Sequence, residues 1–174
     1  MSVTSVYLDP NIFISPLVYE GSRKAANAKR ILGMVEGGEI VGYTSTLTWD
    51  EIVWVVRKLL GKADSVQAGE KFSVFPNLRF IPVSEEIIRN AQRLVAEYDS
   101  DPGDSIHVAS ALSRKVEALV SDDPDIDALA EIKRLSSDSF RPRGMISVMK
   151  FSSSATPSPR TLLASTLPVL AYLS

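Results

Sequence analysis

The sequence contains no cysteine and a single histidine, His107, among its 174 residues. The absence of cysteine excludes disulfides, thiolate zinc sites, iron–sulfur clusters and cysteine nucleophiles. One imidazole leaves very little ligand for a zinc or haem site. Any metal ion that the protein binds must therefore be held mainly by oxygen atoms.

A long hydrophobic run and a strong charge imbalance are also missing. Residues 1–6 have neither the basic nor the apolar segment of a secretion signal, and the apolar stretch at 162–173 is too short to span a membrane and is interrupted by Pro168. The net charge of −2 does not indicate a polyanionic partner. We therefore expect a cytoplasmic protein without membrane contact, in which any nucleic-acid binding depends on local features.

The composition that remains is typical of a folded domain. Hydrophobic residues make up 45% and charged residues 23%, and the length suits one domain. From about residue 141 the sequence changes to runs of Ser and Pro and a weakly charged apolar end. We predict a domain over residues 1–140 and a tail over 141–174, whose order the pattern does not decide.

Strand and helix patterns alternate along the predicted domain. Apolar runs predict strands at 3–8, 39–44, 78–83 and 117–121, and helical periodicity predicts helices at 25–36, 48–60, 67–75, 85–98, 104–115 and 124–133. Asp9-Pro10-Asn11 is interpreted as a turn. This alternation predicts an α/β sandwich with a mainly parallel sheet.

Acidic residues stand at the boundaries of these elements. Asp9 follows the first strand, Asp122 and Asp123 follow the last, and Glu51 and Asp104 lie in the first turns of helices. Ligands of parallel α/β sheets bind outside the carboxyl ends of the strands, where these residues could meet. Each one also has a structural interpretation: a turn for Asp9, a capping box with Thr48 for Glu51, and helix N-terminal positions for Asp104 and Asp123.

Convergence of four carboxylates would have an electrostatic cost. At roughly 5 Å and an effective dielectric near 20, each like-charge pair costs about 3 kcal/mol. Six such pairs would exceed the ~5–15 kcal/mol stability of a whole domain. A converged group would therefore need protonation or a cation, and a hard ion such as Mg²⁺ or Mn²⁺ suits oxygen ligands.

Four ordered motifs resemble those of PIN domains. They are Leu8-Asp9-Pro10-Asn11-Ile12-Phe13, Thr48-x-x-Glu51, Asp104-Ser105-Ile106-His107-Val108-Ala109 and Leu119-Val120-Ser121-Asp122-Asp123-Pro124-Asp125. The resemblance covers about residues 3–135. It implies a three-layer α/β/α sandwich and Mg²⁺- or Mn²⁺-dependent cleavage of RNA, as in VapC toxins of toxin–antitoxin pairs. A VapB-like antitoxin and a homodimer are the partners that it implies.

The resemblance also implies roles for individual residues. Asp9, Glu51, Asp104 and Asp123 match the catalytic acidic quartet, with Asp9, Asp104 and Asp123 as metal ligands. Asn11, Asp122 and Asp125 are supporting candidates, and Asp122 and Asp123 could exchange roles. Pro10 departs from the family pattern, because it replaces a small hydroxyl residue and removes a backbone N–H.

Other interpretations stay open at this point. His107 is interpreted as a packing or hydrogen-bonding residue rather than a general base, and Trp49 and Trp54 as packing residues rather than base-stacking ones. A phosphotransfer site fits less well, because Asn11 stands where that pattern needs a second Asp. The alternatives are a PIN-fold RNA-processing nuclease outside a toxin pair and an inactive module that binds RNA or metal.

Overall fold

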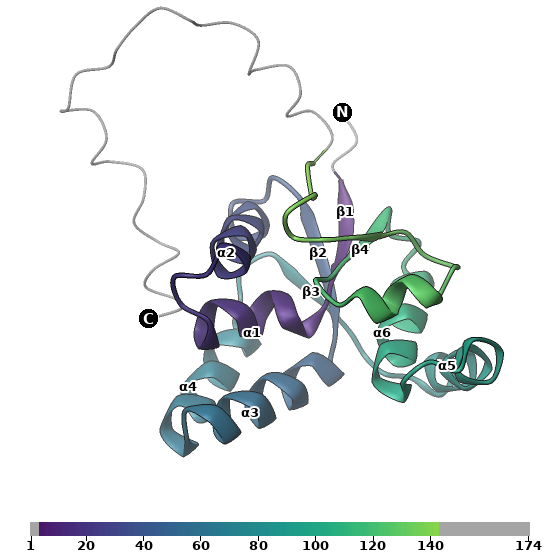
Figure 1. Cartoon of the computed structure of the whole chain (residues 1–174), viewed down its shortest axis with the longest axis horizontal. Helices are drawn as coiled ribbons and strands as arrows, with labels where there is room; N and C mark the ends of the chain where they lie inside the picture. Colours follow the sequence, from purple (N-terminus) through teal and green to yellow (C-terminus); the bar gives the residue numbers. More distant parts are fainter. Residues whose placement is uncertain (1–3, 143–174) are drawn as a thin grey trace, which may run out of the picture.

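A five-stranded parallel sheet forms the centre of the protein (Figure 1), whose computed structural model describes residues 4–142. The strands are β1 (Ser5–Leu8), β2 (Val41–Ser45), β3 (Leu78–Ile81), β4 (Ala118–Val120) and β5 (Arg134–Leu135), in the order β3-β2-β1-β4-β5. Tyr7 of β1 stands opposite Tyr43 of β2 and Leu119 of β4. The predicted α/β fold with a parallel sheet is confirmed.

Helices cover both faces of this sheet. They are α1 (Pro10–Val18), α2 (Arg23–Glu36), α3 (Leu47–Leu59), α4 (Lys62–Ser73), α5 (Glu85–Tyr98), α6 (Pro102–Ser113) and the 3₁₀ helix η1 (Pro124–Ala128). Side chains alternate along β1, so that Val6 and Leu8 pack with α1–α4 and Tyr7 packs with α5 and α6. Figure 1 shows these two helical groups on opposite sides of the strands, which confirms the three-layer α/β/α arrangement.

A glycine allows a close approach between α2 and the sheet. A Cβ atom on Gly42 of β2 would lie 2.8 and 2.9 Å from the two methyl groups of Val35 in α2. A side chain larger than hydrogen would therefore push α2 away from the strand. The fully buried Val35 packs directly on the backbone of β2 as a result.

The predicted turn at Asp9–Asn11 is wrong, because α1 begins there. Asp9 is the N-cap and its carboxylate accepts a hydrogen bond from the Asn11 backbone N–H, while Pro10 takes the first helical position. At that position proline loses no helical hydrogen bond and its fixed φ suits the helix. The Asp-Pro pair is thus a helix start, and the missing N–H of Pro10 has no structural cost here.

The capping box at Thr48 and Glu51 is also wrong. Helix α3 begins at Leu47, and Thr48 is already inside it with a buried hydroxyl that bonds to the hydroxyl of Thr44 at 2.8 Å. The carboxylate of Glu51 instead bonds to His107. The tertiary contact has therefore replaced the local one.

Other boundaries differ from the prediction by a few residues, with two larger differences. Helix α4 begins at Lys62, five positions before the predicted start at residue 67. Of the predicted helix at 124–133, only η1 at Pro124–Ala128 is helical, and strand β5, which pairs with β4, follows at Arg134–Leu135. A two-residue strand has no periodicity of its own, so sequence pattern could not find it.

The strand order brings distant segments together at one edge of the sheet. From β1 the chain moves to β2 and β3 on one side, then crosses to β4 and β5 on the other. The residues that follow β1 and β4 therefore lie side by side at the topological switch point, where α/β folds bind ligands. Within residues 4–142, no helix is long and apolar enough to cross a membrane, and the apolar stretch at 162–173 lies outside the described residues.

Candidate active site

Asp9 lies at the switch point and is almost completely buried, with 5% exposure. Its Oδ2 accepts hydrogen bonds from the Asn11 backbone N–H at 3.4 Å and from the Ser121 hydroxyl at 3.1 Å. The Ser121 hydroxyl in turn accepts from the Asn11 side-chain amide at 2.7 Å and from the Asp123 backbone N–H at 3.0 Å. Ser121 thus links the segments after β1 and β4 and orients the Asp9 carboxylate.

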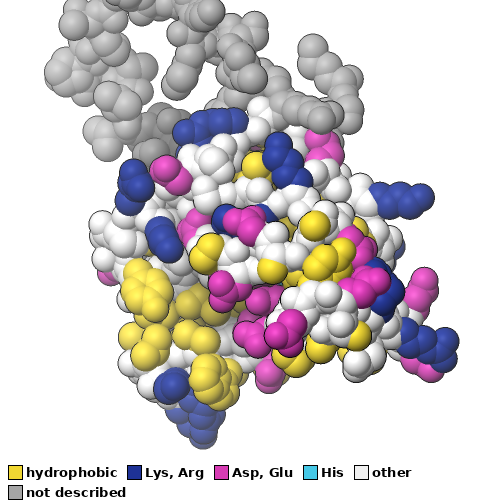
Figure 2. Space-filling model, turned by 45° about the vertical axis from the view of Figure 1, so that its right-hand side comes forward, with side chains coloured by type: hydrophobic (Ala, Val, Ile, Leu, Met, Phe, Trp, Pro, Cys, Tyr) yellow, Lys and Arg dark blue, Asp and Glu magenta, His cyan; other side chains and the backbone are white. Residues whose placement is uncertain are grey.

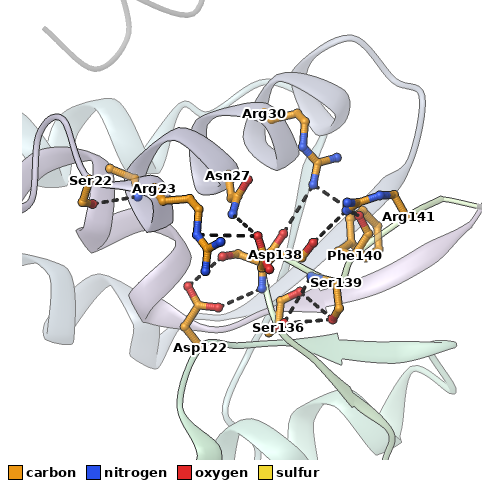
Figure 3. A network of polar contacts seen from close by, with 12 residues as sticks. Ser22, Arg23, Asn27, Arg30, Asp122, Ser136, Asp138, Ser139, Phe140 and Arg141 are labelled. Carbon is orange, nitrogen blue, oxygen red and sulfur yellow. Dashed lines mark hydrogen bonds and ion pairs between the residues drawn. The ribbon is translucent and has the colours of Figure 1, made fainter.

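Asp122 and Asp123 have different surroundings. Asp122 accepts hydrogen bonds from the backbone N–H and hydroxyl of Ser137, at 2.8 and 2.7 Å, in the network of Figure 3. Asp123 is half-buried, caps η1 through the backbone N–H of Asp125, and its charge acts on Asp104. The geometry therefore favours Asp123 as the fourth acid, with Asp122 anchoring the segment at residues 136–141. Asp125 is exposed and contacts Asp123 through its backbone N–H.

Glu51, His107 and Tyr7 form a hydrogen-bonded row. The His107 Nε2 lies 2.6 Å from the Glu51 Oε1, and the Nδ1 lies 2.6 Å from the Tyr7 hydroxyl. His107 and Tyr7 are buried, whereas the Glu51 side chain keeps 36% exposure. The interpretation of His107 as a hydrogen-bonding residue is confirmed in its geometry, although its partner in the candidate site was not foreseen.

Burial raises the pKa values of Asp9 and Asp104, and nearby acids raise the pKa of His107. Burial raises the pKa of Asp9 to about 7 against the opposing effect of His107, with a smaller contribution from Glu51. Burial and the charge of Asp123 raise the pKa of Asp104 to about 6. Burial alone would lower the pKa of His107, but the hydrogen bond to Glu51 and the charges of Asp9, Glu51 and Asp104 outweigh it and raise the pKa.

Charge interactions connect the four acids in pairs. Glu51 acts on both Asp9 and Asp104, and Asp123 acts on Asp104. The helix dipole of α6 adds positive potential at Asp104, which lies in its first turn. Acidic side chains gather near the centre of the face shown in Figure 2, with hydrophobic side chains beside them.

A metal ion would fit this neighbourhood without a complete protein cage. No group of three His, Asp or Glu side chains within residues 4–142 is arranged as a ready-made metal site. Mg²⁺ usually takes one or two carboxylates and fills the remaining positions with water and phosphate oxygens. The buried Asp9, whose ionisation burial disfavours, is the kind of ligand that a divalent cation would stabilise in its charged form.

Sequence reasoning missed four contributors to the site. Ser121 stands inside the fourth motif but carries no chemical signal of its own, Tyr7 looks like an ordinary core residue of a strand, and Asp101 adds charge next to Asp104. Arg134 was also missed: it donates to the Ser121 carbonyl at 2.9 Å, and its hydrogen bond to Asp127, with the charges of Asp127, Asp122 and Asp123, raises its pKa. Their roles depend on which strands become neighbours.

Solved structures of toxin–antitoxin systems resemble this fold at low sequence identity. VapBC2 from Rickettsia felis, bound to a promoter DNA fragment, matches with 14% identity and a TM-score of 0.61, over 76% of this chain and 98% of that one. VapC20 from Mycobacterium tuberculosis, a Sarcin-Ricin loop cleaving toxin, matches with 17% identity and a TM-score of 0.61, over 73% and 95%. A toxin–antitoxin complex from Klebsiella pneumoniae matches with 21% identity and a TM-score of 0.53, over 76% and 97%.

At the level of sequence, no curated protein matches the chain. The family model of the PIN domain matches residues 6–132, which include all four acidic motifs and the whole switch-point edge of the sheet. The order of the motifs, the parallel sheet and this match agree with one another. The chain therefore belongs to the PIN domain family.

Proposed function

We propose that this protein is a divalent-metal-dependent endoribonuclease of the VapC toxin type. The observation that carries the proposal is the buried Asp9 at the switch point, in one electrostatic group with Glu51, Asp104 and Asp123. Mutually repelling carboxylates at a ligand-binding edge have a high energetic cost unless a cation offsets it. The structural role of a cap accounts for Asp9 and Asp123 locally, but it does not explain their approach to Glu51 and Asp104.

Asp9, Asp104 and Asp123 are the proposed ligands of Mg²⁺ or Mn²⁺. When bound, such an ion supplies an acidified water and neutralises charge on the scissile phosphate. Ser121 and Asn11 orient Asp9 through their hydrogen bonds, so its carboxylate needs little reorganisation. Glu51, which is partly exposed beside this group, is proposed to orient the attacking water.

The similar structures support RNA as the substrate and an antitoxin as the partner. One of them cleaves the Sarcin-Ricin loop, and others are toxins bound to antitoxins. The surface supports a protein partner as well, because α3 and α4 expose large hydrophobic side chains: Trp49, Trp54, Leu59 and Val66. The two tryptophans are thus more exposed than their interpretation as packing residues predicted. We propose a VapB-like antitoxin and a homodimer as partners, which co-purification and light scattering would test.

A nuclease assay on structured and single-stranded RNA tests the proposal. We expect cleavage with Mg²⁺ or Mn²⁺, none with chelator, and a loss of about 10²-fold or more in kcat for Asp9→Asn and Asp104→Asn. Asp50→Asn is the matched control, since Asp50 is exposed next to Glu51 in α3. Metal binding without cleavage would instead favour the inactive module, and cleavage without any antitoxin partner would favour an RNA-processing nuclease.

The choice between the two adjacent acids has its own test. Asp123→Asn should lose cleavage with little change in stability, because the amide keeps an oxygen that can cap η1. Asp122→Ala should keep the kcat of the folded protein but lower its free energy of unfolding by about 1–3 kcal/mol, because the buried Ser137 loses its acceptor. The reverse pattern in the paired assays would exchange the two roles.

A further inference from the structure

The row from Tyr7 through His107 to Glu51 joins three elements that are far apart in the sequence. Tyr7 lies in β1, His107 in α6 and Glu51 in α3, and both hydrogen bonds of the imidazole are 2.6 Å long. The rings of Tyr7 and His107 are 5.9 Å apart at an angle of 56°. The row passes from the core of the α5–α6 side to the edge of the candidate site.

The chemistry of the imidazole fixes one of its protons. Glu51 is an acceptor when ionised, so the Nε2 facing its Oε1 at 2.6 Å must carry a hydrogen and donate it. This holds for the cationic imidazole and for the neutral Nε2–H tautomer. With Glu51 ionised, the remaining form, which has its only proton on Nδ1, would place two lone pairs against each other and is excluded.

Tyr7 is suited to hold the other side of the ring. Its hydroxyl accepts a hydrogen bond from the Ser45 backbone N–H at 2.9 Å and is completely buried. A neutral hydroxyl can donate to a bare Nδ1 or accept from an Nδ1–H, so it supports both forms of the ring that keep a proton on Nε2. A carboxylate in its place would accept only, and a phenyl ring would leave the Nδ1 without a partner.

We infer that Tyr7 and His107 are positioning residues, which hold the Glu51 carboxylate toward Asp9 and Asp104 through the Nε2–H. One oxygen of Glu51 is taken by His107, while the side chain stays partly exposed, so the second oxygen can reach a water at the site edge. Glu51 keeps one orientation instead of several, in the same way that hydrogen-bonded neighbours fix the orientation of metal ligands. This inference rests on the proposed nuclease function.

Nitrogen NMR of the imidazole tests the geometry without any activity assay. His107 is the only histidine of the chain, so its ring nitrogens give an unambiguous signal in ¹⁵N-histidine-labelled full-length protein. We expect a hydrogen on Nε2 in metal-free wild type, a shift of the Nε2 signal in Glu51→Gln and of the Nδ1 signal in Tyr7→Phe. A bare Nε2 in the wild type would overturn the inference.

Steady-state kinetics with Mn²⁺ test the positioning role. Tyr7→Phe and His107→Leu should lower kcat by roughly 10–100-fold with little change in KM, and His107→Gln, which keeps an N–H donor, should recover part of the loss. Tyr43→Phe is the matched control, because this tyrosine bonds to Arg79 instead of the site. In a Glu51→Ala background Tyr7→Phe should have almost no further effect on kcat.

The outcomes distinguish a failure of the proposed nuclease function from a failure of the positioning role. A wild type without metal-dependent cleavage overturns the proposed function and the positioning role with it, while the NMR result still describes the imidazole. A cleaving wild type in which Tyr7→Phe and Glu51→Ala lower kcat by independent factors overturns the positioning role alone. In that case the proposed nuclease function stands.

Discussion

Asp9 is held by two hydrogen bonds and is destabilised by its burial, and both effects act on the same carboxylate. The Ser121 hydroxyl and the Asn11 N–H bind it, yet burial raises its pKa to about 7, so the folded protein favours the protonated form below that pH. Residues that are costly for stability and well oriented at the same time are typical of functional sites. Burial also raises the pKa of Asp104, whose carboxylate is less buried than that of Asp9.

The stability of the metal-free protein should therefore fall as pH rises from about 4 to about 7. The pKa values of Asp9 and Asp104 are raised in the folded state, so the native form binds more protons than the unfolded one over this range, and the raised pKa of His107 continues the fall above about 6.5. For Asp9, the rise from 3.8 to about 7 corresponds to at most about 4 kcal/mol. Urea unfolding at several pH values with chelator measures the slope.

The Asp9→Asn variant isolates the largest contribution to this slope. In chelator at pH 7 we expect it to be more stable than wild type, with a flatter pH profile, and to gain less stability from Mn²⁺. Asp50→Asn should follow the wild-type profile. A destabilised Asp9→Asn protein at neutral pH would show that the carboxylate contributes more through its hydrogen bonds than it costs by burial.

At the scale of elements, the contact between α2 and β2 depends on the absence of one side chain. Gly42→Ala places a Cβ atom less than 3 Å from the methyl groups of Val35, so we expect a loss of about 1–3 kcal/mol in the free energy of unfolding. Because the clash lies with Val35, the double variant Val35→Ala with Gly42→Ala should lose less than the sum of the single ones. Additive losses in urea unfolding would contradict this account.

At the scale of the whole molecule, the end of the folded domain is a proposal. We propose that the domain ends near residue 140, because Phe140 is buried and Arg30 of α2 donates to the carbonyl groups of Ser137 and Phe140, at 3.3 and 3.2 Å (Figure 3). The segment from residue 143 to the end, which contains most of the predicted tail, lies outside the described residues.

Shortening the chain tests this boundary. A protein that ends after Pro142 should unfold at the same urea concentration as the full chain and keep its RNA cleavage. Phe140→Ala in the full chain should lose about 3–5 kcal/mol, because it removes a buried aromatic ring. If the chain ending at Pro142 is much less stable than the full chain, the domain extends into the predicted tail.

Much of this protein follows from the sequence by itself. Periodicity predicts the alternation of strands and helices because burial on one face repeats every two or 3.6 residues. The absence of cysteine and the presence of one histidine leave mainly oxygen atoms as metal ligands. The four ordered motifs predict the family and the acids Asp9, Glu51, Asp104 and Asp123. Local pattern gave the wrong structure at two places, the turn at Asp9 and the capping box at Thr48. At both places, several local structures fit the same residues.

Only the tertiary structure decided how these residues meet. Strand order places Ser121 beside Asp9, which no spacing in the sequence encodes, and the packing of α6 against β1 brings His107 between Tyr7 and Glu51. The tertiary structure also gives different partners to Asp122, which bonds to Ser137, and Asp123, although the two are neighbours in the chain. The physical reason is that burial pattern determines which face of an element is apolar, whereas hydrogen-bond partners depend on which elements become neighbours.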